Sequence, residues 1–141
     1  MGFEFTKKPT IEICGKEYEC DPTNCDLITG VVNDFPQIVL TGQKIEQKHA
    51  DLKNALANRE TDRVEELGKG IVLENGRLLA HCRDFIQGCL GKEEYEEIFQ
   101  NRKPNSTEHL EVCTYIFKHI MEGRQKVLEG YIDPPSSHVN D

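Results

Sequence analysis

The strongest constraint on the fold of this chain is an apolar pattern that runs from Thr61 to Leu90. Apolar side chains recur there at intervals of three, four and seven residues, which is the spacing of one side of an α-helix. Thr61 is expected to cap this helix, and Gly91 is expected to end it. A helix of this length must cover its apolar side with other elements. The residues of the stripe are Val64, Leu67, Ile71, Leu78, Cys82, Phe85 and Cys89.

The same segment contains residues that oppose a straight helix. Glycine inside a helix costs roughly 1 kcal/mol relative to alanine, and Gly68, Gly70 and Gly76 all lie within the pattern. Asn75 takes the one polar position of the stripe. We therefore expect close packing or a break near Asn75 and Gly76.

Two helices are predicted before this segment. Asp21 or Thr23 can cap a short helix that continues to about residue 34. Phe35-Pro36 interrupts it, and a second helix is predicted over residues 37–59. The apolar stripe of this second helix is predicted to comprise Leu40, Ile45, His49, Leu52 and Leu56.

Two more helices are predicted after Gly91. A short helix is predicted over residues 93–99, with Tyr95, Ile98 and Phe99 on its inward side. Pro104 cannot continue a helix, and Asn105 begins the last one as a capping residue. The apolar stripe of the last helix includes Leu110, Cys113, Phe117, Ile120 and Met121.

The strand signal lies near the N-terminus. Ile11 and Ile13 alternate with polar residues, and a tight turn at Gly15-Lys16 leads to a second short strand that contains Tyr18. An isolated hairpin is marginal in water, so its apolar side needs a helix or another strand against it.

These patterns predict a mainly helical α+β fold in a single domain of residues 1–132. The β-hairpin occupies residues 1–21, and a body of four to five helices occupies residues 22–131. Residues 133–141 are polar and contain two prolines, and they are predicted to form a disordered tail.

Composition narrows the class of partner. The formal net charge of -8 at pH 7 disfavours nucleic acid and anionic membrane surfaces, because both attract basic proteins. No apolar run approaches the ~18–20 residues that span a bilayer. A cytoplasmic protein that meets other proteins is the expectation.

The cysteines do not form a pattern typical of catalysis or metal binding. Cys14, Cys20 and Cys25 are separated by five and four residues, which differs from the closely paired cysteines of structural zinc sites. Cys20 and Cys25 are each followed by an aspartate, and a neighbouring negative charge disfavours a reactive thiolate. We expect no enzymatic activity, no cofactor and no metal, and we expect reduced thiols.

Two stretches of the chain resemble a known family. The C-terminal stretch is similar to the tail assembly chaperones of long-tailed phages and prophages of Gram-positive bacteria, and the hairpin from Ile11 to Cys20 resembles the opening of the same family. The matching parts cover about half of the chain. The C-terminal residues that carry the resemblance are Leu90-Gly91, Glu94-Tyr95, Ile98-Phe99 and Lys103-Pro104-Asn105.

The resemblance implies a non-enzymatic protein of the host cytoplasm that is absent from the mature virion. Members of the family coat the tape-measure protein, keep it soluble and help recruit tail-tube subunits. The tape-measure and tail-tube proteins are therefore the expected partners, together with a homo-oligomer formed through the strand edge or the helices. The residues predicted to meet a partner are Ile11, Ile13, Tyr18, Phe117, Ile120 and Met121.

Two alternatives remain from the sequence. The protein could be a virion structural or connector protein that stays in the particle. It could also be a small cytoplasmic enzyme or metal-binding regulator that uses Cys14, Cys20 and Cys25.

Overall fold

The computed structural model describes residues 2–4 and 8–132, so the predicted tail at residues 133–141 lies outside the described residues. The predicted fold class is confirmed, because an antiparallel hairpin precedes five helices in the described part of the chain. The elements are β1 (Thr10–Ile13), β2 (Lys16–Glu19), α1 (Cys25–Asn33), α2 (Phe35–Ala57), α3 (Thr61–Leu90), α4 (Lys92–Ile98) and α5 (Ser106–Ile132).

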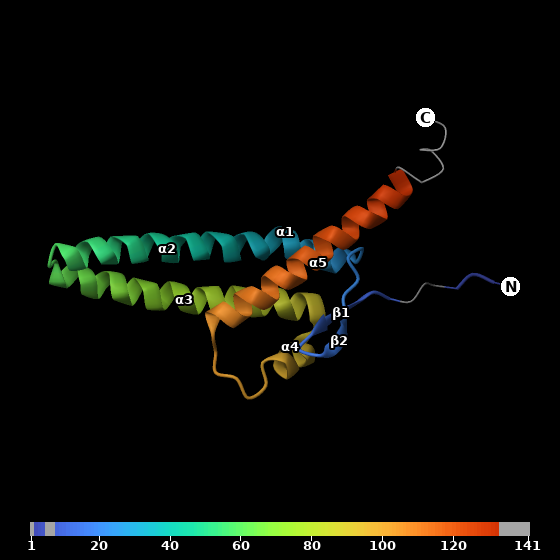
Figure 1. The fold of residues 1–141 in the computed structure, drawn as a ribbon, viewed down its shortest axis with the longest axis horizontal. Helices are drawn as coiled ribbons and strands as arrows, with labels where there is room; N and C mark the ends of the chain where they lie inside the picture. Colours follow the sequence, from blue (N-terminus) through green and yellow to red (C-terminus); the bar gives the residue numbers. More distant parts are fainter. Residues whose placement is uncertain (1, 5–7, 133–141) are drawn as a thin grey trace.

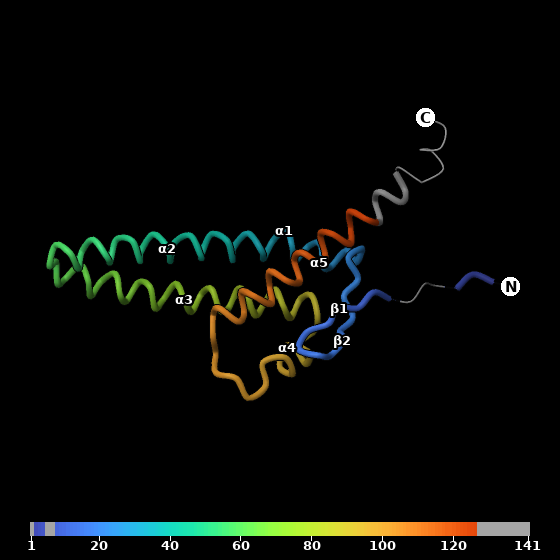
Figure 2. Tube along the Cα trace, in the orientation of Figure 1, coloured from blue at the N-terminus to red at the C-terminus, as the bar shows by residue number. Residues whose placement is uncertain are grey.

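Two long antiparallel helices give the molecule its elongated outline (Figure 1). α1 and α2 follow one another along one line, and α3 returns beside them. The far parts of α2 and α3, residues 39–57 and 61–76, project away from the other elements, and we name them the arm (Figure 2). The hairpin and α4 lie beside the C-terminal half of α3, which α5 crosses.

The hairpin places its apolar residues on one side. Ile11 pairs with Tyr18 across the two strands, and Ile13 pairs with Lys16. The turn lies at Cys14-Gly15, one residue earlier than predicted, and both turn residues have positive φ, at 52° and 82°. Two consecutive positive φ values match the right-handed twist of the flanking strands.

Local hydrogen bonds correct the predicted start of α1. The capping residue is Asn24, whose Oδ1 accepts a hydrogen bond from the backbone N–H of Asp26 at 2.7 Å. The predictions of Asp21 and Thr23 as caps are wrong. Instead Asp21 Oδ1 accepts from the N–H and the hydroxyl of Thr23, at 2.9 and 2.7 Å, and closes the turn before the helix.

The side of α2 that faces α3 differs from the predicted one. Leu40, His49 and Leu56 are exposed, although the sequence analysis placed them on the apolar stripe. In the predicted stripe Leu40 and Ile45 are five residues apart, and this spacing places them on different sides of a helix. Pro36 lies in the first turn of α2, where a missing N–H is tolerated. The residues that face inward are Ile38, Thr41, Ile45, Leu52 and Ala55.

The turn between α2 and α3 is closed by the backbone alone. The N–H of Glu60 donates to the carbonyl of Ala55 at 2.9 Å, and the N–H of Arg59 donates to that of Leu56 at 3.2 Å. Arg59, the second of these donors, has a positive φ of 57°. This pair of bonds satisfies the last carbonyls of α2, as a Schellman motif does.

α3 is one continuous helix of 30 residues. The predicted break near Asn75-Gly76 is wrong, and the capping residue is Glu60 rather than Thr61, without a side-chain cap. Packing against α2 along its length offsets the low helix propensity of the glycines. Gly91 ends the helix with a positive φ of 115°, as the sequence predicts.

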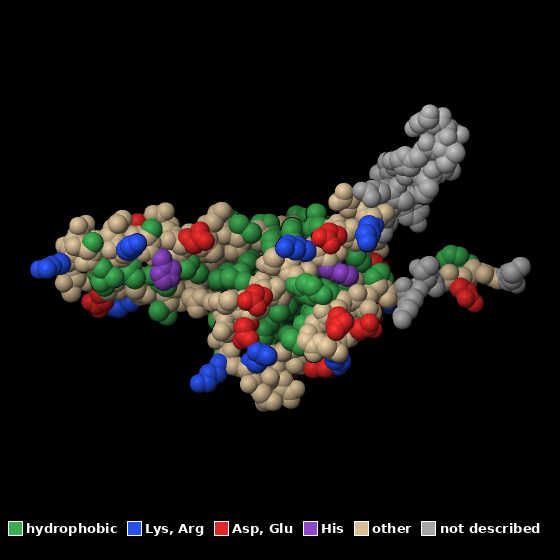
Figure 3. Space-filling model, in the orientation of Figure 1, with side chains coloured by type: hydrophobic (Ala, Val, Ile, Leu, Met, Phe, Trp, Pro, Cys, Tyr) green, Lys and Arg blue, Asp and Glu red, His purple; other side chains and the backbone are tan. Residues whose placement is uncertain are grey.

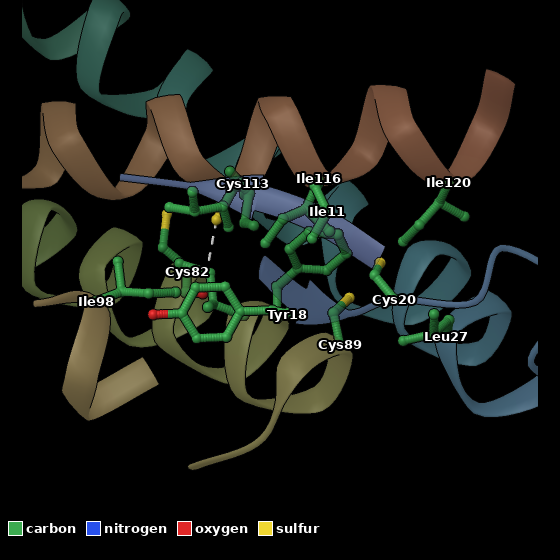
Figure 4. Packing of buried hydrophobic residues seen from close by; sticks show 14 of the residues in the cluster. Ile11, Tyr18, Cys20, Leu27, Cys82, Cys89, Ile98, Cys113, Ile116 and Ile120 are labelled. Carbon is green, nitrogen blue, oxygen red and sulfur yellow. Dashed lines mark hydrogen bonds between the residues drawn. The ribbon is translucent and has the colours of Figure 1, made fainter. Parts of the chain in front are cut away.

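The core lies where the hairpin, α1, the C-terminal half of α3 and α5 meet (Figure 4). Phe35 stacks on Phe117 at a ring-centroid distance of 4.1 Å and contacts Phe85 at 5.5 Å. These rings join the α1–α2 junction to α3 and α5. The largest fully buried side chains here are Phe85, Ile86, Ile116 and Ile120.

α5 comes very close to the connection between β2 and α1. A Cβ atom built on Gly123 would lie 2.4 Å from Cγ and 2.8 Å from Cβ of Pro22. One turn earlier, His119 Nε2–H donates to the backbone carbonyl of Cys20 at 3.2 Å. Only glycine lets α5 approach this ring so closely.

We expect Gly123→Ala to lower the free energy of unfolding by about 1–3 kcal/mol, because the proline ring cannot rotate away from the added methyl group. Urea denaturation measures the change. Gly88→Ala is the control, since a Cβ there meets no atom within 4 Å, and it should be neutral or slightly stabilising. Equal stability of both variants would contradict the close approach.

Candidate protein-binding surface

The arm covers its own apolar seam only in part. Ile45 and Leu52 of α2 face Leu67 and Ile71 of α3, yet all four are only half-buried. Two packed helices shield each other along one line, and the two broad sides of the pair stay open to solvent. A third helix would be needed to close either side.

The arm also carries the main group of exposed hydrophobic side chains. In Figure 3, hydrophobic side chains gather along the arm and continue toward α5. Single exposed apolar residues are common on proteins, but a group of them on one projecting element indicates an interaction surface. The exposed fractions on the arm are Val39 44%, Leu40 49%, Leu56 58%, Val72 74% and Leu73 56%.

Helical spacing assigns Val39 and Val72 to the side that α5 crosses. Val39 follows Phe35 by one turn, and the Phe35 ring stacks on Phe117 of α5. Val72 precedes Leu79 by two turns, and Leu79 lines a cavity together with His109 of α5. Both exposed valines therefore extend, along the arm, the side of α2 and α3 on which α5 lies.

Small residues widen this side of the arm. Gly42 follows Phe35 by two turns, and Gly68 precedes Val72 by one. A Cβ at either glycine would meet no atom within 4 Å, so the space above them is open. Leu56 follows Gly42 by about four turns and so lies on the same side of α2. We define the α5-side surface as Val39, Gly42, Leu56, Gly68 and Val72.

On the opposite side of the arm, the seam between α2 and α3 contains a buried carboxyl group, that of Glu74. Glu74 Oε1 accepts a hydrogen bond from Arg77 Nη1 at 2.7 Å, but its buried Oε2 has no partner. The residue lines a hollow of about 420 Å³ that Lys44 and Lys48 also border. A buried carboxylate oxygen without a hydrogen bond is costly.

We expect Glu74→Leu to raise the free energy of unfolding by about 1 kcal/mol, because leucine removes the unsatisfied oxygen and fills the same part of the seam. Thermal unfolding at fixed pH measures this effect. Glu65→Leu, which removes an exposed ion pair with Lys69, should change stability by less than about 0.5 kcal/mol. A clear destabilisation by Glu74→Leu would show that the carboxylate is paired in solution.

The structure buries four of the six predicted partner residues inside the monomer. The apolar side of the hairpin packs against the apolar stripe of α5. These are the two surfaces that were predicted to receive partners. Phe117 is half-buried against Phe35, and only Met121, at 45%, is exposed. The four buried residues of the predicted set are Ile11, Ile13, Tyr18 and Ile120.

A cavity between α3, α4 and the start of α5 contains a buried histidine. His109 Nδ1–H donates to the carbonyl of Asn105 at 2.7 Å, and Nε2 is hydrogen-bonded to the hydroxyl of Tyr95 at 2.7 Å. Phe99 stacks on the imidazole at 3.9 Å. Burial raises the pKa of Tyr95. These contacts tie α4 to α5, which is a structural role.

A groove of about 480 Å³ lies between β2, α1 and α4 and is acidic. The Lys16 ammonium pairs with Glu97 across it, which raises the pKa of Lys16. Hydrogen bonds from Thr23 lower the pKa of Asp21. The bordering elements β2, α1 and α4 lie away from the tip of the arm (Figure 1). Its acidic residues are Glu17, Glu19, Asp21, Asp26, Glu93, Glu94 and Glu97.

The three cysteines weighed as metal ligands have different surroundings. Cys14 and Cys25 are exposed, whereas Cys20 is buried, and burial raises the pKa of its thiol to about 11. Within residues 2–4 and 8–132, no group of three or more cysteine, histidine or acidic side chains could hold a metal ion. In the same part of the chain, no helix is long and apolar enough to cross a membrane.

Comparisons of the chain with protein-family models, with curated proteins and with solved structures found no match.

Proposed function

We propose that this protein is a tail assembly chaperone that binds the tape-measure protein in the host cytoplasm, keeps it soluble and helps recruit tail-tube subunits. The observation that carries the proposal is the α5-side surface, which leaves Leu56 and Val72 more than half exposed. The resemblance of residues 90–105 to this family supports the same role. The client would be an amphipathic helix of the long tape-measure protein.

The shape of the surface suits a helical client. α5 already lies across α2 and α3, and the α5-side surface continues the same side of these helices along the arm. A client helix placed there would pack against both α2 and α3 and cover the half-buried seam between them. An amphipathic helix in an apolar groove is a recurring mode of peptide recognition.

The energetics favour weak single sites. Burying ~400 Å² of apolar area would contribute on the order of 10 kcal/mol at about 25 cal/mol per Å². Association itself costs about 4–15 kcal/mol, so one copy would bind weakly and release its client readily. Many copies along one long client would hold it through multivalency. Self-association of the chaperone would strengthen this effect.

Co-expression with the tape-measure protein tests the proposal. The client alone should be largely insoluble, and this protein should bring it into the soluble fraction as a complex that purifies over a tag on the client. An unchanged insoluble fraction would count against chaperone function. Mass spectrometry of purified tails separates the chaperone from a connector protein, because the chaperone should be missing from the particle.

A further inference from the structure

The contact between α3 and α5 places two buried cysteines against each other. Cys82 and Cys113 are both fully buried, and they come from different helices (Figure 4). Cys113 Sγ lies 3.6 Å from the backbone carbonyl of Cys82 and donates a hydrogen bond to it. The two thiols also influence each other's titration, because their interaction lowers the pKa of Cys82 and raises that of Cys113.

We propose that Cys82 and Cys113 form a modification site, at which a low-molecular-weight disulfide oxidises the pair to an intramolecular disulfide that joins α3 to α5. The contact of Cys113 Sγ with the backbone of Cys82, and the full burial of both side chains in one core, carry this inference. No function of the arm is required for it.

The oxidation balances in two exchange steps. The Cys82 thiolate, after losing its proton to water, attacks one sulfur of oxidised glutathione, and one glutathione thiolate leaves. Cys113 then loses its proton to water and attacks the mixed disulfide at the Cys82 sulfur, and the second glutathione leaves as a thiolate. Two protein S–H bonds are lost and one S–S bond forms. The S–S bond of the reagent is reduced to two thiols.

The surroundings set the order and the speed of these steps. The hydrogen bond from Cys113 lowers the pKa of Cys82, so Cys82 is the first nucleophile. Because both thiols are shielded from solvent, the first step waits for α5 to open locally. The second step is intramolecular and follows in the same open state, in which Cys113 is exposed as well.

The other buried thiols are poorer candidates. Burial raises the pKa of Cys89 to about 12 and that of Cys20 to about 11, so neither thiol competes with Cys82 as the first nucleophile. Cys14 and Cys25 are exposed and are free to form glutathione adducts or links between molecules. A Cys14→Ser, Cys25→Ser background removes those side reactions and leaves the core cysteines unchanged.

The test treats this background protein with oxidised glutathione and with dithiothreitol. Trypsin should release Leu78–Arg83 joined to Lys103–Lys118 from the oxidised sample, because the bond between Lys103 and the following proline resists cleavage. The linked pair should weigh two hydrogens less than the sum of its parts. Glutathione adducts without this pair, or a Cys20–Cys89 disulfide in its place, would overturn the proposal.

Stability provides an independent readout. The disulfide closes a loop of about 30 residues, and restricting the unfolded chain in this way should raise Tm on the order of 10 °C. Dithiothreitol should reverse the rise. Cys113→Ala should end at a glutathione adduct on Cys82, without a rise in Tm. If Cys113→Ala does not fold, the peptide mapping of the background protein still shows whether the Cys82–Cys113 disulfide forms. Formation of this disulfide without a rise in Tm would contradict the placement of the two cysteines at the α3–α5 contact.

Discussion

Replacing Phe85 with alanine is expected to lower the free energy of unfolding by about 3–5 kcal/mol. The ring is fully buried, and its centroid lies 5.5 Å from that of Phe35 at the α1–α2 junction. Phe35 in turn stacks on Phe117 of α5. Removal of Phe85 would therefore leave a cavity where four helices meet, and the remaining aromatic pair could not fill it without shifting α5.

Urea denaturation followed by circular dichroism measures this loss. Small domains are stable by only about 5–15 kcal/mol, so Phe85→Ala would leave the protein near its unfolding threshold. Tyr115→Ala is the matched control, because Tyr115 is an aromatic residue of α5 that is 48% exposed. It should cost less than about 1 kcal/mol. Similar losses for both variants would mean that the core does not lie at the α3–α5 contact.

The second large effect concerns binding. We expect Val72→Lys to reduce the affinity for the proposed tape-measure client at least about tenfold, which corresponds to 1.4 kcal/mol. A client helix over the α5-side surface would force the new ammonium group out of water beside apolar atoms. The folded monomer should keep its stability, because Val72 is 74% exposed.

Leu73→Lys is the matched control for this variant. Leu73 is the next residue of α3, turned about 100° further around the helix and away from the side that α5 crosses. It is 56% exposed and large, so loss of a nonspecific apolar contact would affect both variants alike. A tenfold loss with Leu73→Lys, and none with Val72→Lys, would place the client on the opposite side of the arm.

The sequence was most informative where a single periodicity ran without interruption. The stripe from Val64 to Cys89 predicted α3, and Gly91 and Asn105 correctly marked a helix end and a helix start. α2 was harder, because its apolar residues lie on several sides of the helix. Packing against α3 selected Ile38 and Ala55 for burial, and no intrinsic propensity of α2 alone distinguishes them from Leu40 and Leu56.

The candidate surface was missed for a related reason. Periodicity identifies apolar sides of elements, but it does not tell which sides cover one another. Ile11 and Ile120 were expected to meet a partner, yet the hairpin and α5 bury each other. One signal for the arm was present, since Val72 and Leu73 interrupt the regular stripe of α3. Large apolar residues off a stripe must face solvent or a partner.

Photo-crosslinking in cells tests the central idea most directly, because it asks which side of the arm meets the client. A photo-reactive amino acid is placed at position 72 or at position 73, and the protein is co-expressed with the tape-measure protein. Irradiation should join the client to position 72 and give little product at position 73. A soluble complex that crosslinks only from position 73, or from neither position, would contradict binding at the α5-side surface.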